Sequence, residues 1–254
     1  MGDANAERQS QVFFEIHSAN AREGPGCFAS TRRAFLTLKN LPASPQILDI
    51  GCGPGRQTLD LASLTPGTIH AVDNHLPYIE ALRTSAAAAT LKARILPHLA
   101  DMASLPFPPA SFDLIWSEGA IYIIGLEKGL GLWKPLLRPG GFLAVTHIAW
   151  LRDDPPREVR EFWQQAYPAI DTIAAHEAVV RRQGYEPVDT FALPERAWID
   201  EYYRPLERTV ERLRVKYAGD PVALRVLEAE EQEFALYRKY SAYYGYVFLI
   251  ARRP

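Results

Sequence analysis

The stretch Ile47-Leu48-Asp49-Ile50-Gly51-Cys52-Gly53-Pro54-Gly55 decides how the rest of the chain folds. Its first four residues are apolar except for one carboxylate, which is typical of a buried strand. Three glycines at alternate positions follow, and a polar run suited to a helix begins at Arg56. A strand that turns sharply into a helix leaves backbone N–H groups free, and glycine lets the backbone bend and a ligand approach. The stretch is therefore a candidate nucleotide-binding turn.

The glycine spacing distinguishes two kinds of nucleotide-binding turn. The dinucleotide pattern G-x-G-x-x-G is met at Gly51 and Gly53, but its third glycine position holds Arg56, and Gly55 comes one residue early. In dinucleotide-binding folds the third glycine allows the helix to pack closely on the strand, so an arginine there disfavours NAD. What remains is a G-x-G-x-G loop with an acid, Asp49, on the preceding strand.

Length and composition limit the class of protein. The chain has 254 residues, of which 48% are apolar and 23% are charged, and its formal net charge is -2. These values are ordinary for a globular protein and give no electrostatic case for nucleic-acid binding. No uncharged apolar run is long enough to cross a bilayer, and residues 1–10 lack the apolar core of a secretory signal. Cys27 and Cys52 form neither a disulfide framework nor a metal-ligand set, so the sequence predicts no metal and a cytoplasmic location.

Alternating strand and helix patterns predict an α/β fold with a doubly wound, Rossmann-like sheet. Strands are expected, in chain order, at residues 47–50, 68–73, 93–99, 112–116, 142–149, 188–193 and 246–251. Helical patterns between the first five of these strands indicate a parallel sheet with helices on both faces. The last strand follows a helical insertion and suits an antiparallel position, so the sheet is expected to have about seven strands.

Polar residues follow the predicted strands at their carboxyl ends, where ligands bind in parallel α/β sheets. Asp73 ends the second strand about twenty residues after the first glycine, and an acid there can accept hydrogen bonds from both ribose hydroxyls of an adenosine group. An aspartate that caps the next helix is the structural alternative, and the two roles are compatible. Asp101, Ser117 and His147 are expected near the same edge. The sequence therefore predicts a ligand that contains ribose.

Five motifs in this order resemble the class I S-adenosylmethionine-dependent methyltransferases, closest to the bacterial small-molecule enzymes that include ubiquinone- and menaquinone-type C-methyltransferases. The match covers residues 45–149, with a looser match in the final strands. Each motif is weak alone, but their order and spacing make the resemblance specific. The motifs are Leu-Asp-Ile-Gly-Cys-Gly-Pro-Gly (48–55), Ala-Val-Asp (71–73), Ala-Asp-Met (100–102), Phe-Asp-Leu-Ile-Trp-Ser (112–117) and Leu-Leu-Arg-Pro-Gly-Gly-Phe-Leu (136–143).

The resemblance implies S-adenosyl-L-methionine as the cofactor and in-line transfer of its methyl group to a small-molecule acceptor. A non-catalytic S-adenosylmethionine-binding protein or a protein methyltransferase on the same fold are the alternatives. The resemblance implies that Asp49 orders the glycine loop or contacts the methionine amino group through water. It also implies that Asp73 holds the ribose and that Asp101 either accepts a hydrogen bond from the adenine amino group or caps its own loop. The implied cofactor-binding residues are Asp49, Gly51, Cys52, Gly53, Gly55, Asp73, Asn74, Asp101, Met102 and Ser117.

A general base is needed only if the acceptor is protonated at neutral pH. Candidates at the strand ends are Glu118, Tyr122 and His147. Glu118 directly follows the fourth strand and could act as a base, hold a cationic acceptor or pair with Arg22. A histidine on a buried strand, such as His147, is more often a core or pocket-lining residue. Residues 117–120 differ from the Asn-Pro-Pro-Tyr motif of enzymes that methylate nucleic-acid amino groups, so nucleic acid is not an expected partner. A membrane is not an expected partner either, because no apolar run is long enough to cross one. A monomer or homodimer is expected.

The whole chain, residues 1–254, is expected to form one methyltransferase domain. Residues 45–150 form its predicted cofactor-binding core, and residues 151–254 add substrate-side helices and the final strands. Residues 1–44 are helical and either form a lid over the active site or only cover a sheet edge. The polar residues that a lid would bring to a substrate are Glu15, His17, Asn20 and Arg22. The acidic run in the insertion is interpreted as a solvated helix face, made of Glu228, Glu230, Glu231 and Glu233.

Overall fold

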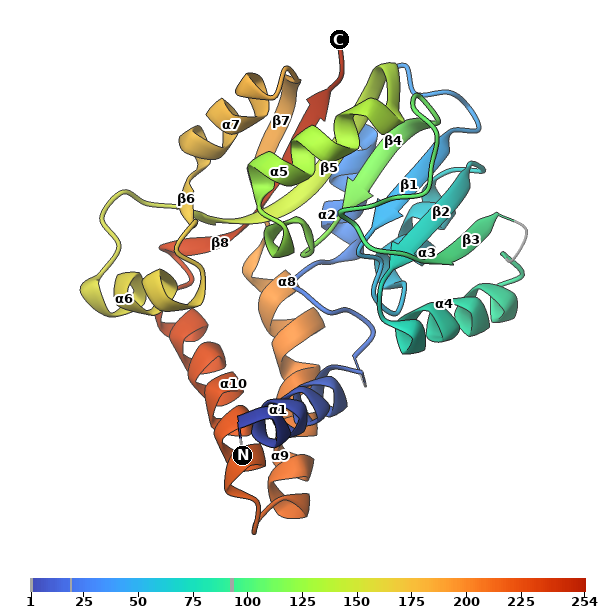
Figure 1. Ribbon diagram of the computed structural model, residues 1–254. Helices are drawn as coiled ribbons and strands as arrows, with labels where there is room; N and C mark the ends of the chain where they lie inside the picture. The colour runs from blue at the N-terminus through green and yellow to red at the C-terminus, as the bar shows by residue number, and fades with distance from the viewer. Residues whose placement is uncertain (1, 19, 92–93) are drawn as a thin grey trace.

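One eight-stranded sheet organises the fold (Figure 1). The computed structural model describes residues 2–18, 20–91 and 94–254. The strand order is β3-β2-β1-β4-β5-β8-β7, and the short β6 pairs with β5 outside that path. The bounds are β1 Gln46–Ile50, β2 Thr68–Asp73, β3 Ile95–Leu99, β4 Phe112–Ser117, β5 Leu137–Trp150, β6 Asp171–Thr172, β7 Glu186–Ala192 and β8 Tyr244–Arg252.

The strand directions confirm the predicted Rossmann-like sheet. Strands β3, β2, β1, β4 and β5 are mutually parallel, whereas β8 runs antiparallel to both β5 and β7. The extra strand, β6, has only two residues, which is too short for any sequence period to reveal. Position 93, where the third strand was expected to start, lies outside the described residues.

Helices cover both faces of the sheet because successive strand side chains point to opposite faces. Ile47 and Leu114 pack with α2, α3 and α4, whereas Leu48 and Ile115 pack with α5 and α7. The helices of the sheet layers are α2 Phe28–Leu36, α3 Arg56–Leu64, α4 Leu76–Ala88, α5 Leu126–Trp133 and α7 Ile173–Arg182. None of the helices in the described residues combines the length and the apolarity needed to cross a bilayer.

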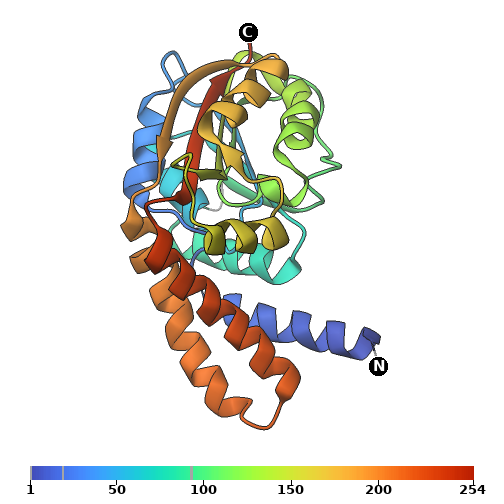
Figure 2. The same ribbon diagram turned by 90° about the vertical axis from the view of Figure 1, so that its left-hand side faces the viewer.

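The remaining long helices form an arm that extends beyond the sheet (Figure 2). Helices α9 and α10 are antiparallel, and α1 lies against both of them. Apolar side chains of all three helices make a third core cluster. The elements of this region are α1 Gly2–His17, α6 Arg157–Ala166, α8 Glu195–Trp198, a π-helical turn Ile199–Tyr203, α9 Arg204–Lys216 and α10 Pro221–Tyr240.

Strand β5 begins earlier than the sequence indicated. The fifth strand was expected at residues 142–149, but residues 138–141 also belong to β5. The positive φ of 79° at Gly140 accommodates the irregular backbone there. Backbone hydrogen bonds of 2.8 Å join Gly140 to Arg253 and Arg253 to Gly141, so the end of the chain fixes this stretch as an extended strand.

Gly55 lets two parts of the chain pack closely, which is the role that a dinucleotide-binding fold gives to a glycine at position 56. Gly55 precedes α3 with φ of 98°, and a Cβ there would lie 2.3 Å from Leu82 Cδ1 of α4. Arg56 instead lies on the surface, with its Nε 3.2 Å from a carboxylate oxygen of Asp60. The early glycine therefore still allows close packing, here between the start of α3 and Leu82 of α4.

We expect Gly55→Ala to lower the free energy of unfolding by about 1–3 kcal/mol, since it combines a strained positive φ with a steric clash. Urea unfolding measures the change. Gly219→Ala is the control, because a Cβ at Gly219 would meet no atom within 4 Å. Equal stability of the two variants would contradict this account of Gly55.

Candidate active site

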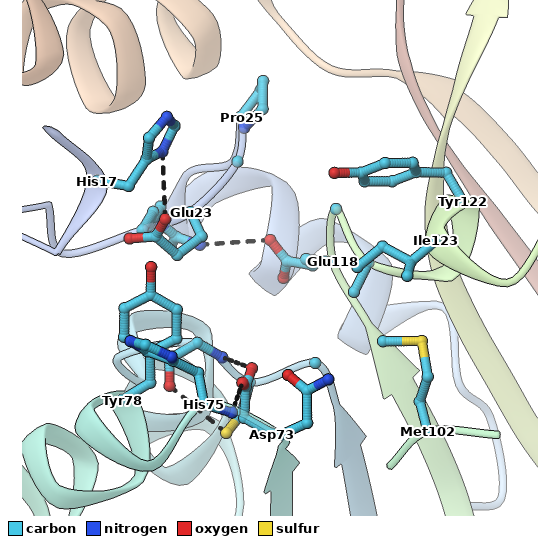
Figure 3. Close-up of a pocket in the computed structure, with 18 of the residues that line it drawn as sticks. His17, Glu23, Pro25, Asp73, His75, Tyr78, Met102, Glu118, Tyr122 and Ile123 are labelled. Atoms are coloured by element: carbon cyan, nitrogen blue, oxygen red, sulfur yellow. Dashed lines mark hydrogen bonds and ion pairs between the residues drawn. The ribbon is translucent and has the colours of Figure 1, made fainter. Parts of the chain in front are cut away.

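A cavity of about 630 Å³ lies at the carboxyl ends of the parallel strands. The glycine loop and the ends of β2 and β4 form one side of it, and α1, residues 22–25 and α10 contribute to the other. In Figure 3, Asp73 and Met102 lie below Glu118, while His17, Glu23 and Tyr122 lie above. This cavity is where a parallel α/β sheet places its ligand.

Seven of the ten predicted cofactor-binding residues line this cavity: Gly51, Cys52, Gly53, Asp73, Asn74, Asp101 and Met102. The Asp73 carboxylate accepts hydrogen bonds of 2.9 Å from the backbone N–H groups of Gly53 and His75. It therefore ties the glycine loop to His75, the residue before α4, but it does not cap that helix, which has no side-chain cap. Each carboxylate oxygen has two lone pairs, so the same group can still accept a ligand hydroxyl.

The other three predicted residues, Asp49, Gly55 and Ser117, lie behind the cavity wall. The Thr58 hydroxyl donates to Asp49 Oδ2 at 2.6 Å, and burial raises the pKa of Asp49 to about 7. Asp49 Oδ1 is buried and has no hydrogen-bond partner among the described residues. The Ser117 hydroxyl donates to the carbonyl of Ile50 at 2.8 Å, which leaves this side chain a structural role.

The loop after β3 is fixed by two hydrogen bonds beside the cavity. Asp101 Oδ1 accepts from the backbone N–H of Ala103 at 2.8 Å, so the loop-cap alternative is present. Trp133 Nε1 donates to the Met102 carbonyl at 2.9 Å and holds that backbone in place. Both residues line the cavity, so the cap leaves Asp101 available to a ligand.

Residues 20–26, here called the cover segment, cross over the glycine loop and the turn after β4. A Cβ built on Gly53 would lie 3.3 Å from Glu23 Cγ, and one built on Gly24 would lie 3.6 Å from Gly119 Cα. Part of α1 also lines the cavity, whereas α2 packs into the sheet core. The first part of the N-terminal region thus has the geometry of a lid, and α2 covers the sheet face.

Arg22 joins the cover segment to two parts of the core. Its guanidinium forms ion pairs with Asp60 of α3 and with Glu118, the latter at 3.3 Å. The other Glu118 oxygen accepts from the Thr31 hydroxyl at 2.8 Å and from Trp116 Nε1 at 2.9 Å. Burial raises the pKa of Glu118, and the charge of Arg22 opposes that rise. The predicted pairing of Glu118 with Arg22 is confirmed.

His17 forms a second ion cluster on the opposite wall. Its Nδ1 lies 3.2 Å from a carboxylate oxygen of Glu23, and its Nε2 lies 3.3 Å from one of Glu230. Burial disfavours the imidazolium, but the two carboxylates outweigh burial and raise the pKa of His17 to about 9. His17 is therefore charged at neutral pH, and it links α1, the cover segment and α10.

The two other base candidates occupy different environments. Tyr122 lines the cavity, and its hydroxyl points into it in Figure 3. His147 is 1% exposed and does not line the cavity; its Nε2 lies 3.5 Å from the hydroxyl of Tyr167, which does. Burial and the neighbouring His176 lower the pKa of His147 to about 3. The structure therefore places His147 behind a tyrosine, and its imidazole is neutral.

The acidic run of α10 is not wholly a solvated face. Glu228 and Glu231 are exposed, but Glu230 and Glu233 line the cavity. The prediction was wrong for these two because α1 and the π-helical turn pack against that face of α10, which one helix's sequence does not show. Their spacing of three residues, which places both on one helix face, was the available signal. Aromatic wall residues that the sequence did not single out are Phe13, Phe14, Tyr78, Trp163, Tyr167, Trp198 and Tyr246.

Sequence comparisons find similarity to methyltransferases. Residues 47–141 match the family model of a methyltransferase domain. The chain is 29% identical over 257 aligned residues to a 27-O-demethylrifamycin SV methyltransferase of Amycolatopsis mediterranei, covering 95% of this chain and 88% of that protein. It is 33% identical over 164 residues to a malonyl-[acyl-carrier protein] O-methyltransferase of Salmonella typhimurium, covering 64% of this chain and 56% of that protein.

The fold has close counterparts among solved structures. An S-adenosylmethionine-dependent methyltransferase of Geobacter sulfurreducens, solved with S-adenosyl-L-homocysteine, superposes with a TM-score of 0.82 at 19% identity, covering 96% of this chain and 98% of that one. These similarities identify the chain as an S-adenosylmethionine-dependent methyltransferase. It transfers a methyl group from S-adenosyl-L-methionine to a small-molecule acceptor. The narrower likeness to ubiquinone- and menaquinone-type enzymes stays a prediction.

The elevated pKa of His17 predicts a pH-dependent contribution to stability. Its folded-state value of about 9 exceeds the ordinary value of 6.5, so the contribution is complete below 6.5 and is lost as the pH rises through about 9. Near pH 6.5 we expect the free energy of unfolding of the wild type to exceed that of His17→Gln by about 2–3 kcal/mol. Above pH 9 we expect the two free energies of unfolding to become similar. Chemical unfolding at a series of pH values measures this difference, and a difference that stays constant across the window would argue against a charged His17.

Glu118→Gln tests whether Glu118 anchors Arg22. In this variant an amide nitrogen would face a hydrogen-bond donor in place of a carboxylate oxygen, and Arg22 would keep only Asp60 as a charged partner. We therefore expect the free energy of unfolding to fall by about 1–3 kcal/mol. Urea denaturation gives the value, with exposed Glu127→Gln as the control. Unchanged stability together with lost turnover would instead identify Glu118 as a base.

Proposed function

We propose that the cavity holds S-adenosyl-L-methionine against the glycine loop and the acceptor on the opposite side, between α1, α10 and the turn after β4. The observation that carries this proposal is one continuous cavity with two unlike walls. One wall is backbone, glycine and the Asp73 carboxylate. The other is made of aromatic and acidic side chains from both ends of the chain.

The glycine-loop wall fits the cofactor in two respects. Gly51 and Gly53 leave backbone open to the cavity, and a Cβ at Gly51 would lie 2.3 Å from Ala120 Cβ. The buried, unpartnered Asp49 Oδ1 fits a water-mediated contact to an amino group. Asp73 is the ribose ligand in this proposal, and Asp101, beside Met102, is the adenine ligand.

When bound, S-adenosyl-L-methionine supplies an electrophilic methyl group on its sulfonium for in-line displacement. The protein contributes orientation and the exclusion of water, and holding two reactants in position supplies a large part of the barrier reduction. The cover segment closes the cavity above Gly53 and Gly119. Glu118 keeps this segment in place, because one of its oxygens pairs with Arg22 and the other accepts hydrogen bonds from Thr31 and Trp116.

Tyr122 is the proposed side chain that orients the acceptor, since it reaches the cavity directly. His147 acts through Tyr167, as a positioning residue whose Nε2 lies 3.5 Å from the Tyr167 hydroxyl. The acceptor is a small molecule rather than a protein or nucleic acid in this proposal, because the acceptor wall is enclosed and acidic. The buried thiols of Cys27 and Cys52 are free, which suits a cytoplasmic enzyme, and a monomer or homodimer stays a prediction.

Asp73→Ala tests the cofactor assignment. We expect the affinity for S-adenosyl-L-homocysteine to fall by about 1–3 kcal/mol, because charge-assisted hydrogen bonds to the ribose and the tie to the Gly53 N–H are lost together. Calorimetry measures the affinity, and circular dichroism checks the fold. Asp154→Ala, at an exposed position, should bind like wild type. Unchanged affinity of a folded Asp73→Ala variant would refute the ribose role.

A further inference from the structure

The acceptor side of the cavity carries more negative than positive side chains. Arg22 is shared between two carboxylates, Asp60 and Glu118. His17 is likewise shared between Glu23 and Glu230. Asp60 also pairs with Arg56, so the Arg22 cluster is balanced, whereas the single charge of His17 faces two carboxylates. Among the described residues neither cation forms an ion pair with a further carboxylate, although the charge of His17 partly offsets the rise in the pKa of Glu233.

Glu233 is that further carboxylate. It lines the cavity and accepts a hydrogen bond of 2.9 Å from the Tyr203 hydroxyl. Within the part of the chain that the structure describes, no lysine or arginine forms an ion pair with it. Burial, followed by the repulsion of Glu230, raises the pKa of Glu233 to about 7. A carboxylate in this setting is stabilised by any positive charge that enters the cavity.

A second observation also calls for a ligand donor. Glu23 Oε1 is buried beside the cavity and has no hydrogen-bond partner among the described residues. A buried carboxylate oxygen without a donor is costly, and an N–H group of a ligand would satisfy it. Glu23 and Glu233 thus flank the space from the cover segment and from α10.

Aromatic side chains complete this wall. Tyr202 and Tyr246 line the cavity, and both lie close enough to Glu233 for its charge to raise their pKa values further after burial. Trp198 also lines the cavity, with its ring centroid 5.1 Å from that of Tyr246. Trp198 is 2% exposed, and its Nε1 has no hydrogen-bond partner within the described ranges. Aromatic faces next to carboxylates are the usual environment for an organic ammonium group.

We propose that the methyl acceptor is a small organic cation, an apolar or aromatic body with an ammonium group that is bound by Glu233 and Glu23 among Tyr202, Tyr246 and Trp198. A protonated nitrogen has no lone pair for a methyl group, so the ammonium is the anchor and the methylated atom lies elsewhere in the molecule. This inference rests on the proposed division of the cavity.

Three soluble probes that share a 4-hydroxyphenylethyl body but differ in charge test the proposal: tyramine (a cation), N-acetyltyramine (neutral) and 3-(4-hydroxyphenyl)propionate (an anion). Calorimetry is run on the full chain saturated with S-adenosyl-L-homocysteine. We expect tyramine to bind about tenfold more tightly than either other probe. Equal or weaker binding of tyramine, including no measurable binding at millimolar concentration, would overturn the proposal, whatever the variants do.

The variants locate the cation. Glu233→Gln should weaken tyramine binding about tenfold and leave N-acetyltyramine binding unchanged, because only the charge is removed. Glu228→Gln, on the exposed face of the same helix, should retain the wild-type preference. A preference for tyramine that survives Glu233→Gln would refute the role of Glu233.

The same experiment separates this inference from the proposed function. Binding of S-adenosyl-L-homocysteine is measured first, and its absence would overturn the proposed function itself. Normal binding of S-adenosyl-L-homocysteine with no preference for the cation would overturn only the inference about the acceptor.

Discussion

The ion pairs of Arg22 are the interaction on which the geometry of the site depends. One buried guanidinium holds the cover segment against α3 and against the turn after β4. Buried ion pairs add little net stability over an apolar core, but breaking one leaves an uncompensated charge at a cost of several kcal/mol. Their contribution is therefore to specify one position for the cover segment. That position encloses the cavity and keeps water from the reacting groups.

The two sides of the cavity are built by different physical means. The glycine-loop side relies on backbone groups, absent side chains and one carboxylate, Asp73, all fixed by regular sheet and helix geometry. The acceptor side relies on side chains of α1, α10 and the π-helical turn. A π-helical turn widens a helix locally and is frequent at functional sites, and here it places Tyr202 on the cavity and Tyr203 against Glu233.

The sequence predicted the sheet and the glycine-loop side well because both depend on local patterns. Strand periodicity, the glycine spacing and the position of Asp73 each reflect a few neighbouring residues. The acceptor side depends on pairs far apart in the chain, such as His17 with Glu230, which no local pattern indicates. For this reason the inward-facing Glu230 and Glu233 were mistaken for surface residues. His147 was correctly placed on its strand, but its position behind Tyr167 required the packing of α6 and the segment that follows.

The arm has a consequence for how the molecule folds. The glycine-loop side is made by strands and helices that follow one another in sequence, whereas the acceptor side joins the two ends of the chain; Arg8, for example, bonds Asp220 across 212 positions. Long-range contacts pay more loop-closure entropy and form later. The units from β1 to β4, with their helices, can therefore assemble before the arm closes. In heat or denaturant the side of the cavity built by the arm should therefore open before the glycine-loop side.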